Sequence, residues 1–433
     1  MKVLALALAD EAQRFIKGYP PKGARLFLKP NLEISRLAAL LSERDQFRYL
    51  DERVETLEPD GSEDIVLCHV GLTQANPARE LAARLGARAP GAGIPSDDCR
   101  LPIVDCQSKL VLFGPLATAW GDSAPEWVGP RVVGDVTSVW PELRQDAESG
   151  AFKPVYRAPL QPAYIVPQRG IARNPEMIAG HQPMSFIRGC FCPEPLRRFC
   201  TEYLYFGTNV LIRSPEEVIG EVLSVPDKRI QLLDEDVASF PDYYYDLFRS
   251  LWNYRRQWLV NASDRLFEHP RLIRLLAKAG VRMVFLNDSF LDGRLDRAGS
   301  DERTLKWLYR QVKSLQAAKM LVGARATLRL EPGAKRNFEP AAAVLRKIDL
   351  DFVELRFIEP GPDGTDRICP VAYHPMVSNH EPGHIKNRFY AMEAIIDRLL
   401  RRPRRVGFYT TATYLLPWSM AYRQSFLEGI PFP

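Results

Sequence analysis

Three cysteines gather in one short segment of this 433-residue chain. Cys190, Cys192 and Cys200 lie within eleven residues, in the sequence that begins Arg188-Gly189-Cys190-Phe191-Cys192. Thiolates bind soft metals and iron–sulfur clusters, and three of them from one loop leave a fourth coordination position for a ligand from outside the protein. The spacing therefore predicts a metal centre. The alternative is a loop with three buried, unreactive cysteines.

The composition predicts a globular protein of two or three domains. Hydrophobic residues make up 46% of the chain and charged residues 26%, and the net charge is only +5. The charges form no basic stripe, so nucleic-acid binding is not expected. The one dense basic run, Arg401-Arg402-Pro403-Arg404-Arg405, is typical of a solvated helix end, with polyanion binding as the alternative.

Three features predict a cytoplasmic location without a membrane span. The first apolar stretch lasts only about seven residues before Asp10, which favours a β-strand over a signal peptide. No window reaches the roughly 18 uncharged apolar residues that a membrane span needs. The seven cysteines, an odd number without a secretion signal, favour reduced thiols.

The elements before the cysteines predict an open parallel sheet of Rossmann-like type over residues 1–150. Short strands are expected at 3–8, 47–51, 64–70, 110–113 and 131–133, and helices at 34–41, 77–85 and 140–146. Ligands of such sheets bind beyond the carboxyl ends of the strands. The residues expected there are Leu72, Thr73, Gly114, Pro115, Thr118, Gly134 and Asp135. No G-x-G-x-x-G follows any strand, so a dinucleotide is not expected.

The remaining chain predicts a connector, a second α/β domain and an extension. Residues 151–183 are rich in proline and are expected to join two domains, with an edge strand at 163–166. Residues 184–370 alternate strand and helix at intervals of about 30 residues, which predicts a full or partial α/β barrel. Residues 371–433 are expected to form a helical and aromatic extension.

Polar side chains follow three successive strands of this predicted barrel. They lie where a barrel places its ligand, because barrel strand ends carry the chemistry, and the acids of the first cluster are candidates to bind a hydroxyl pair or an amino group. The alternative is that they are turn and cap residues, which favour Asp, Asn and Ser in any protein. The three clusters are Asp234, Glu235 and Asp236; Asn261, Ser263 and Arg265; and Asn287, Asp288 and Ser289.

The order of these features resembles that of the cobalamin-dependent radical S-adenosylmethionine enzymes, over roughly residues 1 to 365. In the first domain the resemblance rests on residues 32–41 and 51–55, on the strand ending in Thr73, and on the Phe113-Gly114-Pro115 and Gly134-Asp135 turns with Thr118. In the second it rests on the cysteine segment, residues 201–221, Asp234-Glu235, Lys278-Ala279-Gly280 and the turn at 359–365.

The resemblance implies a Rossmann-like cobalamin-binding domain followed by a partial TIM-type barrel. It implies cobalamin without a protein His ligand, since the chain lacks D-x-H-x-x-G and His69 lies within a predicted strand. It further implies a 4Fe-4S cluster on Cys190, Cys192 and Cys200, and an electron donor of flavodoxin or ferredoxin type. The implied contacts of S-adenosylmethionine are Phe191, Asp234, Glu235, Asn261, Ser263, Asn287 and Ser289.

The chain departs from the family pattern at two places. The usual loop is C-x-x-x-C-x-x-C, whereas this chain has C-x-C-x7-C, with Arg197 three residues before Cys200. Either an insertion lets Cys192 reach the same iron, or only two thiolates bind and the cluster is absent or labile. The fourth strand ends in Asn287-Asp288-Ser289 instead of Glu-Ser.

The implied activity is methyl transfer to an unactivated carbon of a small molecule, a natural product or a tetrapyrrole. Ring-forming and rearranging enzymes share the architecture. Two further alternatives are a methyltransferase that uses S-adenosylmethionine without homolysis, and a degenerate cobalamin-binding partner protein. Aromatic residues such as Tyr205, Tyr244 and Trp258 are expected either to line the substrate cavity or to belong to the core. No catalytic residue and no substrate is assigned from the sequence.

Overall fold

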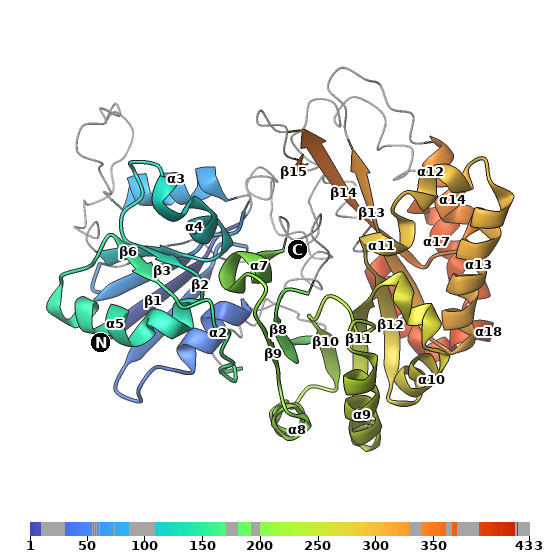
Figure 1. Cartoon of the computed structure of the whole chain (residues 1–433), viewed down its shortest axis with the longest axis horizontal. Helices are drawn as coiled ribbons and strands as arrows, with labels where there is room; N and C mark the ends of the chain where they lie inside the picture. Colours follow the sequence, from blue (N-terminus) through green and yellow to red (C-terminus); the bar gives the residue numbers. More distant parts are fainter. Residues whose placement is uncertain are drawn as a thin grey trace. The chain divides into compact units, whose positions relative to one another are not determined.

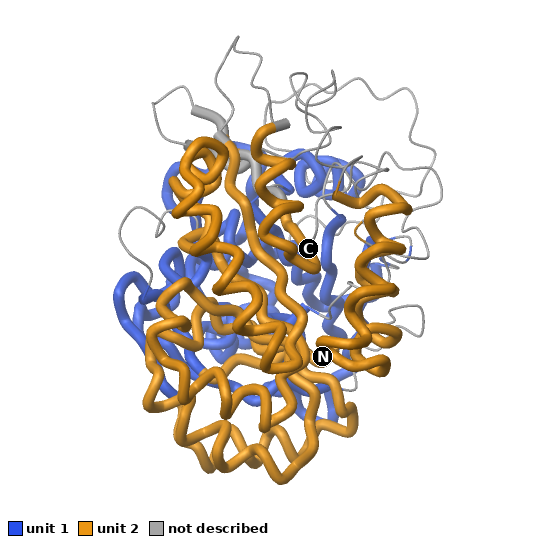
Figure 2. Tube along the Cα trace, turned by 90° about the vertical axis from the view of Figure 1, so that its right-hand side faces the viewer, with its two compact units in different colours: residues 1–20, 30–177, 187–212 blue, residues 21–29, 178–186, 213–433 orange. Residues whose placement is uncertain are grey.

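The chain forms two compact units, each with its own sheet (Figure 2). Unit 1 comprises Met1–Pro20, Pro30–Met177 and Ile187–Ile212, and unit 2 comprises Pro21–Lys29, Ile178–Phe186 and Arg213–Pro433. The computed structural model describes residues 1–9, 31–85 except 54, 56, 58, 60 and 73, then 109–169, 181–191, 200–329, 339–360, 366–369, 389–420 and 422. The domain boundaries of the sequence analysis stay a prediction.

Unit 1 contains a six-stranded parallel sheet in the order β2-β1-β3-β4-β5-β6 (Figure 1). The predicted open parallel sheet is therefore confirmed. The predicted strand at 163–166 is wrong: this stretch is irregular, and prolines 162 and 167 beside it lack the N–H that a ladder needs. The strands are β1 (Lys2–Ala7), β2 (Gln46–Asp51), β3 (Ile65–His69), β4 (Leu110–Phe113), β5 (Arg131–Val133) and β6 (Val155–Arg157).

Helices cover both faces of this sheet, as a buried parallel sheet requires. Along β1, Val3, Ala5 and Ala7 pack into one core, and the alternating leucines pack into the other. Figure 1 shows the sheet between the two pairs of helices. The helices are α2 (Leu32–Ala38) and α5 (Val136–Ser149) on the first face, and α3 (Ala75–Arg84) and α4 (Pro115–Trp120), which continues into η3 (Gly121–Ser123), on the second.

A small hairpin and a helix complete unit 1 around the cysteines. Strands β8 (Ile187–Gly189) and β9 (Val210–Ile212) pair antiparallel, and helix α7 (Thr201–Phe206) lies between them in the chain. Helix α7 packs against α4. Cys190 follows β8 directly and Cys200 precedes α7 directly, so both flank the segment whose middle, with Cys192, lies outside the described residues.

Unit 2 contains six parallel strands that lie side by side in chain order, followed by one antiparallel edge strand. This sequential winding is that of a barrel that has not closed, which confirms the predicted partial barrel. The strands are β7 (Gln182–Met184), β10 (Arg229–Leu232), β11 (Gln257–Ala262), β12 (Val281–Leu286), β13 (Leu321–Arg329), β14 (Phe352–Pro360) and the antiparallel β15 (Asp366–Cys369).

Helices follow the strands of unit 2 and pack on its sheet (Figure 1). Helix α8 begins with a capping box in which Ser214 and Glu217 satisfy each other's backbone N–H groups. The principal helices are α8 (Pro215–Ser224), α9 (Pro241–Leu251), α10 (Pro270–Lys278), α13 (Glu302–Ala317), α14 (Glu339–Lys347) and α17 (Met392–Arg401). Shorter ones are η4 (Trp252–Tyr254), η5 (Asp264–Glu268), α11 (Asp288–Leu291), α12 (Arg294–Ala298), α18 (Pro403–Val406), α19 (Phe408–Thr410) and the π-helix η6 (Thr411–Leu415).

The aromatic residues of α9 and β11 belong to the core of unit 2. Tyr244, Phe248 and Trp258 are each 0% exposed. The ring of Phe248 lies 5.4 Å from that of Trp258, in an edge-to-face arrangement. Tyr244 and Trp258 are therefore core residues, the second of the two roles expected for them.

The basic run at the end of α17 is only partly solvated. Arg402 is 0% exposed and donates to Asp351 and Asp349, the latter at 2.9 Å, whereas Arg404 is exposed. The prediction of a solvated helix end is thus wrong for Arg402, because the acids that pair with it precede β14 and are distant in sequence. In the part of the chain that the structure describes, no helix combines the length and the apolar character needed to cross a membrane.

Candidate functional site

Glu202 holds the two ends of the cysteine segment together. Its Oε2 accepts a hydrogen bond from the backbone N–H of Gly189 at 2.7 Å and another from Nε of Arg188 at 3.0 Å. Gly189 precedes Cys190, and Glu202 lies in the first turn of α7, two residues after Cys200. This carboxylate therefore closes the loop at its base, with one predicted cluster ligand on each side.

Gly189 is required at the entrance to this loop. Its φ is +98°, and a Cβ at this position would lie 2.0 Å from the carbonyl oxygen of Asn209 on the neighbouring chain segment. A side chain would therefore force β8 and β9 apart. The glycine of the Arg-Gly-Cys sequence at the start of the loop is thus required by close backbone packing.

Arg188 links the cysteine segment to the sheet of unit 1. It is 2% exposed, its Nη2 lies 3.2 Å from Oδ2 of Asp135, and its guanidinium lies 4.9 Å from the ring centre of Phe206. Burial alone would lower the pKa of Arg188, but the carboxylates of Glu202 and Asp135 raise it above its ordinary value. Arg188 is therefore a buried cation between two anions.

Asp135, a predicted cobalamin contact, serves both α5 and Arg188. Its Oδ1 caps α5 by accepting from the backbone N–H of Thr137 at 2.9 Å and from the Thr137 hydroxyl at 2.7 Å. Its Oδ2 faces Arg188. The carboxylate joins the end of β5 to the segment that carries the cysteines, so it positions the site.

Thr118 joins two of the turns that the sequence analysis assigned to cobalamin. Its hydroxyl donates to the carbonyl oxygen of Gly114 at 3.0 Å and accepts from the backbone N–H of Gly134, also at 3.0 Å. Gly114 has a φ of +107°, and a Cβ there would lie 2.8 Å from the carbonyl oxygen of Val70. The carboxyl ends of β3, β4 and β5 are therefore locked to one another through backbone groups.

Replacing Thr118 with valine should lower the free energy of unfolding by about 1–2 kcal/mol, since the backbone N–H of Gly134 loses its acceptor, while the Gly114 carbonyl keeps the backbone N–H of residue 118. Thr118→Ser keeps the hydroxyl and should stay within about 0.5 kcal/mol of the natural chain. Urea unfolding followed by circular dichroism measures both variants. Equal stability of the valine and serine variants would show that the bridge contributes nothing.

His69 ends β3 and faces an acid. Its Nε2 lies 3.7 Å from Oε2 of Glu33, and the hydroxyl of Tyr205 donates to Oε1 of Glu33 at 2.9 Å. Burial raises the pKa of Glu33, but His69, Tyr205 and Arg188 together bring it below its ordinary value. His69 thus lies at the strand end, as expected, and its imidazole faces a carboxylate.

The remaining predicted cofactor contacts of unit 1 have the following positions in the structure. Leu72 is half-buried in the turn after β3, and Pro115 is buried as the first residue of α4. Phe191 is half-buried after Cys190. Thr73 and Cys192 lie outside the described residues.

In unit 2, Asp234 joins three elements. Its Oδ1 accepts from the Ser185 hydroxyl at 2.9 Å and from the backbone N–H of Phe186 at 3.0 Å, and its Oδ2 accepts from the Tyr244 hydroxyl at 2.6 Å. It is 5% exposed. Burial and this carboxylate raise the pKa of Tyr244 well above its ordinary value. Asp234 therefore connects the ends of β7 and β10 with α9.

The second cluster of polar residues, at the end of β11, contains one hydroxyl that has no hydrogen-bond partner among the described residues. Asn261 donates to the carbonyl oxygen of Asp234 at 3.1 Å, and Asp236 accepts from the backbone N–H of Ser263 at 2.8 Å. The hydroxyl of Ser263 is buried and has no hydrogen-bond partner among the described residues. A buried polar atom without a partner is costly, so Ser263 is suited to a ligand.

In the third cluster, after β12, the polar side chains form hydrogen bonds mostly within the turn that carries them. The side chain of Asn287 accepts from the backbone N–H of Ser289 at 3.2 Å and caps α11. The Ser289 hydroxyl has two acceptors within reach of its one hydrogen, Asn287 at 2.8 Å and Asp264 at 3.0 Å. Asn287 and Ser289 thus hold the turn after β12 in shape.

A charged group at the carboxyl edge of the sheet includes residues that sequence reasoning missed. Arg325 of β13 lies 3.8 Å from Glu235, 3.8 Å from Asp288 and 3.4 Å from Glu354. Glu235 is half exposed, at 51% of its side chain. Arg325 and Glu354 are register partners on neighbouring strands. Both charges lie inside predicted strands between apolar residues, and a charge at such a position is the signal that could have revealed them.

The chain is similar to a known methyltransferase in sequence. No protein-family model matches it. The bacteriochlorophyllide d C-12(1)-methyltransferase of Chlorobaculum tepidum is 22% identical over 344 residues, which cover 76% of this chain and 71% of that protein.

Solved structures resemble the chain over most of its length. The radical S-adenosylmethionine methyltransferase TsrM of Kitasatospora setae, with cobalamin and a 4Fe-4S cluster bound, has a TM-score of 0.54 at 14% identity, covering 87% of this chain and 74% of that one. The cobalamin-dependent S-adenosylmethionine radical enzyme OxsB has a TM-score of 0.53 at 14% identity, covering 79% of this chain and 52% of that one. This chain has the fold of the cobalamin-dependent radical S-adenosylmethionine enzymes. The resemblance inferred from the sequence is thereby confirmed for the fold.

The residues present fit the groups that this fold implies. A sheet of order 2-1-3-4-5 has its topological switch point between β1 and β3, where Gly71 and Leu72 follow β3. Cys190 and Cys200 flank a loop closed by Glu202. The Ser263 hydroxyl, which has no partner among the described residues, lies at the carboxyl edge of the second sheet.

Proposed function

We propose that this protein is a cobalamin-dependent radical S-adenosylmethionine methyltransferase. The observation that carries the proposal is the closure of the Cys190–Cys200 segment by Glu202 and its attachment through Arg188 to the turn after β5. A loop that holds a reactive cluster needs its two ends fixed in this way, since thiolates that are already in position bind the cluster more tightly. Methyltransferases among the similar proteins support the reaction class.

Cys190, Cys192 and Cys200 would hold a 4Fe-4S cluster. Such a cluster would supply the electron for cleavage of S-adenosylmethionine, and bound cobalamin would supply the methyl group. The protein's own residues place these groups and exclude water. Arg188, Asp135 and Glu202 keep the cysteine segment in place, and Thr118 keeps the turns after β4 and β5 in register.

Within the predicted S-adenosylmethionine contacts, we assign different tasks to neighbouring residues. Glu235 and Ser263 would touch the ligand, since the first is exposed at the edge and the second has a hydroxyl that no described residue satisfies. Asp234, Asn261, Asn287 and Ser289 would act as positioning residues, because their polar atoms hold the strand ends together. Phe191 stays a predicted contact.

The substrate is proposed to be a small molecule with a conjugated ring, of natural-product or tetrapyrrole type. The Chlorobaculum tepidum relative is named for a bacteriochlorophyllide, and one TsrM structure holds tryptophan as its substrate. Both compounds carry flat conjugated rings. An electron donor of flavodoxin or ferredoxin type and a cytoplasmic location belong to the same proposal.

Anaerobic purification and reconstitution test the proposal. About four irons, four sulfides and one corrin per chain are expected, together with 5′-deoxyadenosine after reduction. Corrin without iron would overturn the radical mechanism in favour of a degenerate cobalamin-binding protein. Cluster and methyl transfer without 5′-deoxyadenosine would indicate polar use of S-adenosylmethionine instead.

Replacing Cys192 with alanine should abolish cluster assembly. The reason is that a cluster held by two thiolates has lost a covalent ligand to one of its irons. Iron per chain after reconstitution measures the effect, with Cys68→Ala as the control, because Cys68 is a buried core cysteine of β3. An unchanged iron content in Cys192→Ala would refute its role as the middle ligand.

A further inference from the structure

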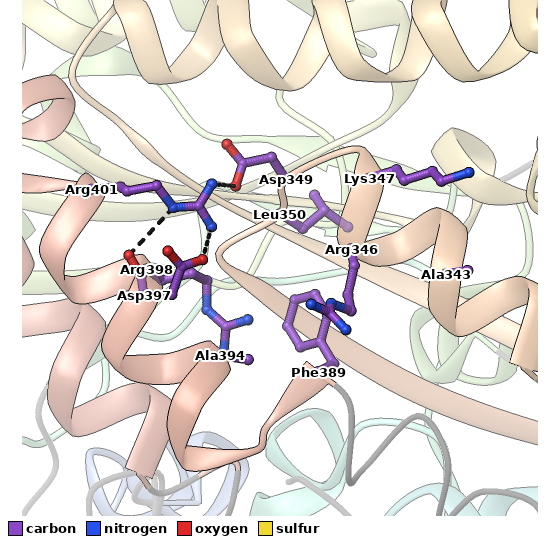
Figure 3. Close-up of a pocket in the computed structure, with 10 residues that line it drawn as sticks. All are labelled: Ala343, Arg346, Lys347, Asp349, Leu350, Phe389, Ala394, Asp397, Arg398 and Arg401. Atoms are coloured by element: carbon purple, nitrogen blue, oxygen red, sulfur yellow. Dashed lines mark hydrogen bonds and ion pairs between the residues drawn. The ribbon is translucent and has the colours of Figure 1, made fainter.

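A pocket lies in unit 2 between α14 and α17, beside the residues that lead into β14 (Figure 3). Its volume is about 350 Å³, which is within the range of small-molecule sites. The pocket is at the amino end of β14, whereas the candidate site lies at the carboxyl ends of the strands. It is therefore separate from the proposed active site, and its ligand is independent of the proposed function.

Arg398 of α17 lines this pocket as a buried cation without a hydrogen-bond partner at two of its nitrogens. The residue is 5% exposed, and its Nε and Nη2 meet no acceptor among the described residues. Burial lowers its pKa below the ordinary value. Its guanidinium lies 4.4 Å from the ring centre of Phe389, a contact that offsets only part of the lost hydration.

The carboxylates of the pocket are already engaged by other cations. Asp397 pairs with Arg401 on the same helix. Asp349 accepts from Arg402 at 2.9 Å and lies 3.1 Å from Arg405, and it also pairs with Lys313. Neither acid forms a hydrogen bond or an ion pair with Arg398, although the charge of Asp349 acts on it from a distance.

Positive charge is in excess around the cavity. Arg346, Lys347, Arg398 and Arg401 line it with only two carboxylates, which leaves a surplus of two positive charges among the described lining residues. In Figure 3 the side chains of Arg398 and Arg346 both point toward the ring of Phe389. Arginine donates two parallel hydrogen bonds to phosphate or carboxylate oxygens, so this arrangement suits a planar or tetrahedral oxyanion.

We propose that this pocket binds a phosphate dianion, either inorganic phosphate or a phosphate monoester. A surplus of two positive charges matches a dianion better than a monocarboxylate. Arg398 supplies the buried donor, and the exposed Arg346 lines the site from α14, whereas the ammonium of Lys347, another lining residue, points away from Phe389 (Figure 3). Leu350 and Phe389 add apolar wall on which the body of a monoester packs.

Calorimetric titration of the full-length chain, purified anaerobically, tests the site with inorganic phosphate and with phenyl phosphate at constant ionic strength. Saturable binding of one phosphate per chain is expected. Tighter binding of phenyl phosphate would identify a monoester as the source, and equal binding would identify free phosphate. No saturable binding of either, or tighter binding of acetate and benzoate than of the matching phosphates, would overturn the proposal.

Arg398→Met removes the charge and keeps much of the volume. It should weaken phosphate binding about tenfold or more, since a charge-assisted hydrogen bond is lost. Arg404→Ala, an exposed arginine of α18 outside the pocket, is the matched control and should bind as the natural chain does.

A thermal shift separates binding from a structural role. Because Arg398 is buried with two nitrogens that no described residue accepts from, Arg398→Met should melt no lower than the natural chain without phosphate. It should also lose the phosphate-induced rise in melting temperature. Arg346→Ala should weaken binding severalfold, and Lys347→Ala should weaken it less because its ammonium points away; neither change, at an exposed position, should alter the melting temperature. Unchanged phosphate affinity in these two variants would overturn the proposal even if Arg398→Met failed to fold.

Discussion

Replacing Arg188 with methionine is expected to lower the free energy of unfolding by about 3–5 kcal/mol. The variant should also fail to retain iron after reconstitution. Both effects follow from one arrangement, in which a 2%-exposed guanidinium lies between Asp135 and Glu202. Methionine fills much of the space but leaves two partly or fully buried carboxylates without their cation.

The loss of the Arg188 guanidinium should affect the cysteine segment first. Glu202 accepts hydrogen bonds from the Arg188 side chain and from the Gly189 backbone N–H. Without Arg188, the Glu202 side chain would turn toward water, and the two ends of the loop would no longer be held together. Chemical denaturation of the cluster-free chain measures the stability, and iron per chain measures the second effect. A loss below about 1 kcal/mol with normal iron content would contradict this account of Arg188.

Arg213→Met provides a matched control in unit 2. Arg213 is equally buried, and its Nη1 donates to Glu221 at 2.6 Å. Its replacement should cost a comparable stability, about 3–5 kcal/mol, because it also breaks a buried ion pair. Iron retention separates the two variants, since Arg213 donates to Ser185, Glu217 and Glu221, which lie outside the Cys190–Cys200 segment.

Replacing Asp234 with alanine is expected to cost about 4 kcal/mol of stability, because three donors lose an ionised acceptor. The donors are the Ser185 hydroxyl, the Phe186 backbone N–H and the Tyr244 hydroxyl. Tyr244→Phe removes one of these bonds alone and should cost about 1–2 kcal/mol. Urea unfolding of the cluster-free chain measures both variants.

The neighbouring acid Glu235 is expected to behave differently. Glu235→Gln should leave stability within about 0.5 kcal/mol, since the side chain is half exposed, but should weaken S-adenosylmethionine binding to the reconstituted protein. Asp234→Ala with unchanged stability and weakened S-adenosylmethionine binding would reverse these assignments and make Asp234 a ligand contact.

The alternation of elements could be predicted from the sequence because each strand and helix carries its own apolar pattern. Strands such as Leu110–Phe113 are buried on both faces, so their sequences read as short apolar runs. The runs at 163–166 and 155–157 mark the limit of such patterns. Both runs are short, and their own sequences do not show which of them forms a strand. Residues 155–157 do so because they pair with β5.

The sequence by itself also determined the chemistry that is available. Three thiols in eleven residues, the Arg188-Gly189-Cys190 entrance and the polar residues after each strand are all local facts. They indicate a cluster loop and a set of strand-end ligands, because thiolate chemistry and strand order do not require knowledge of distant contacts.

Only the tertiary structure decided which polar residue does what. Asp234 and Glu235 are adjacent and chemically similar, yet one is buried against β7 and α9 and the other is exposed at the edge. Arg188 meets Asp135 across 53 positions, and Arg402 meets Asp351 across 51. The physical reason is that a buried charge is neutralised by the partner that the fold places beside it. Such a partner can be distant in the sequence, so the local apolar pattern cannot predict it.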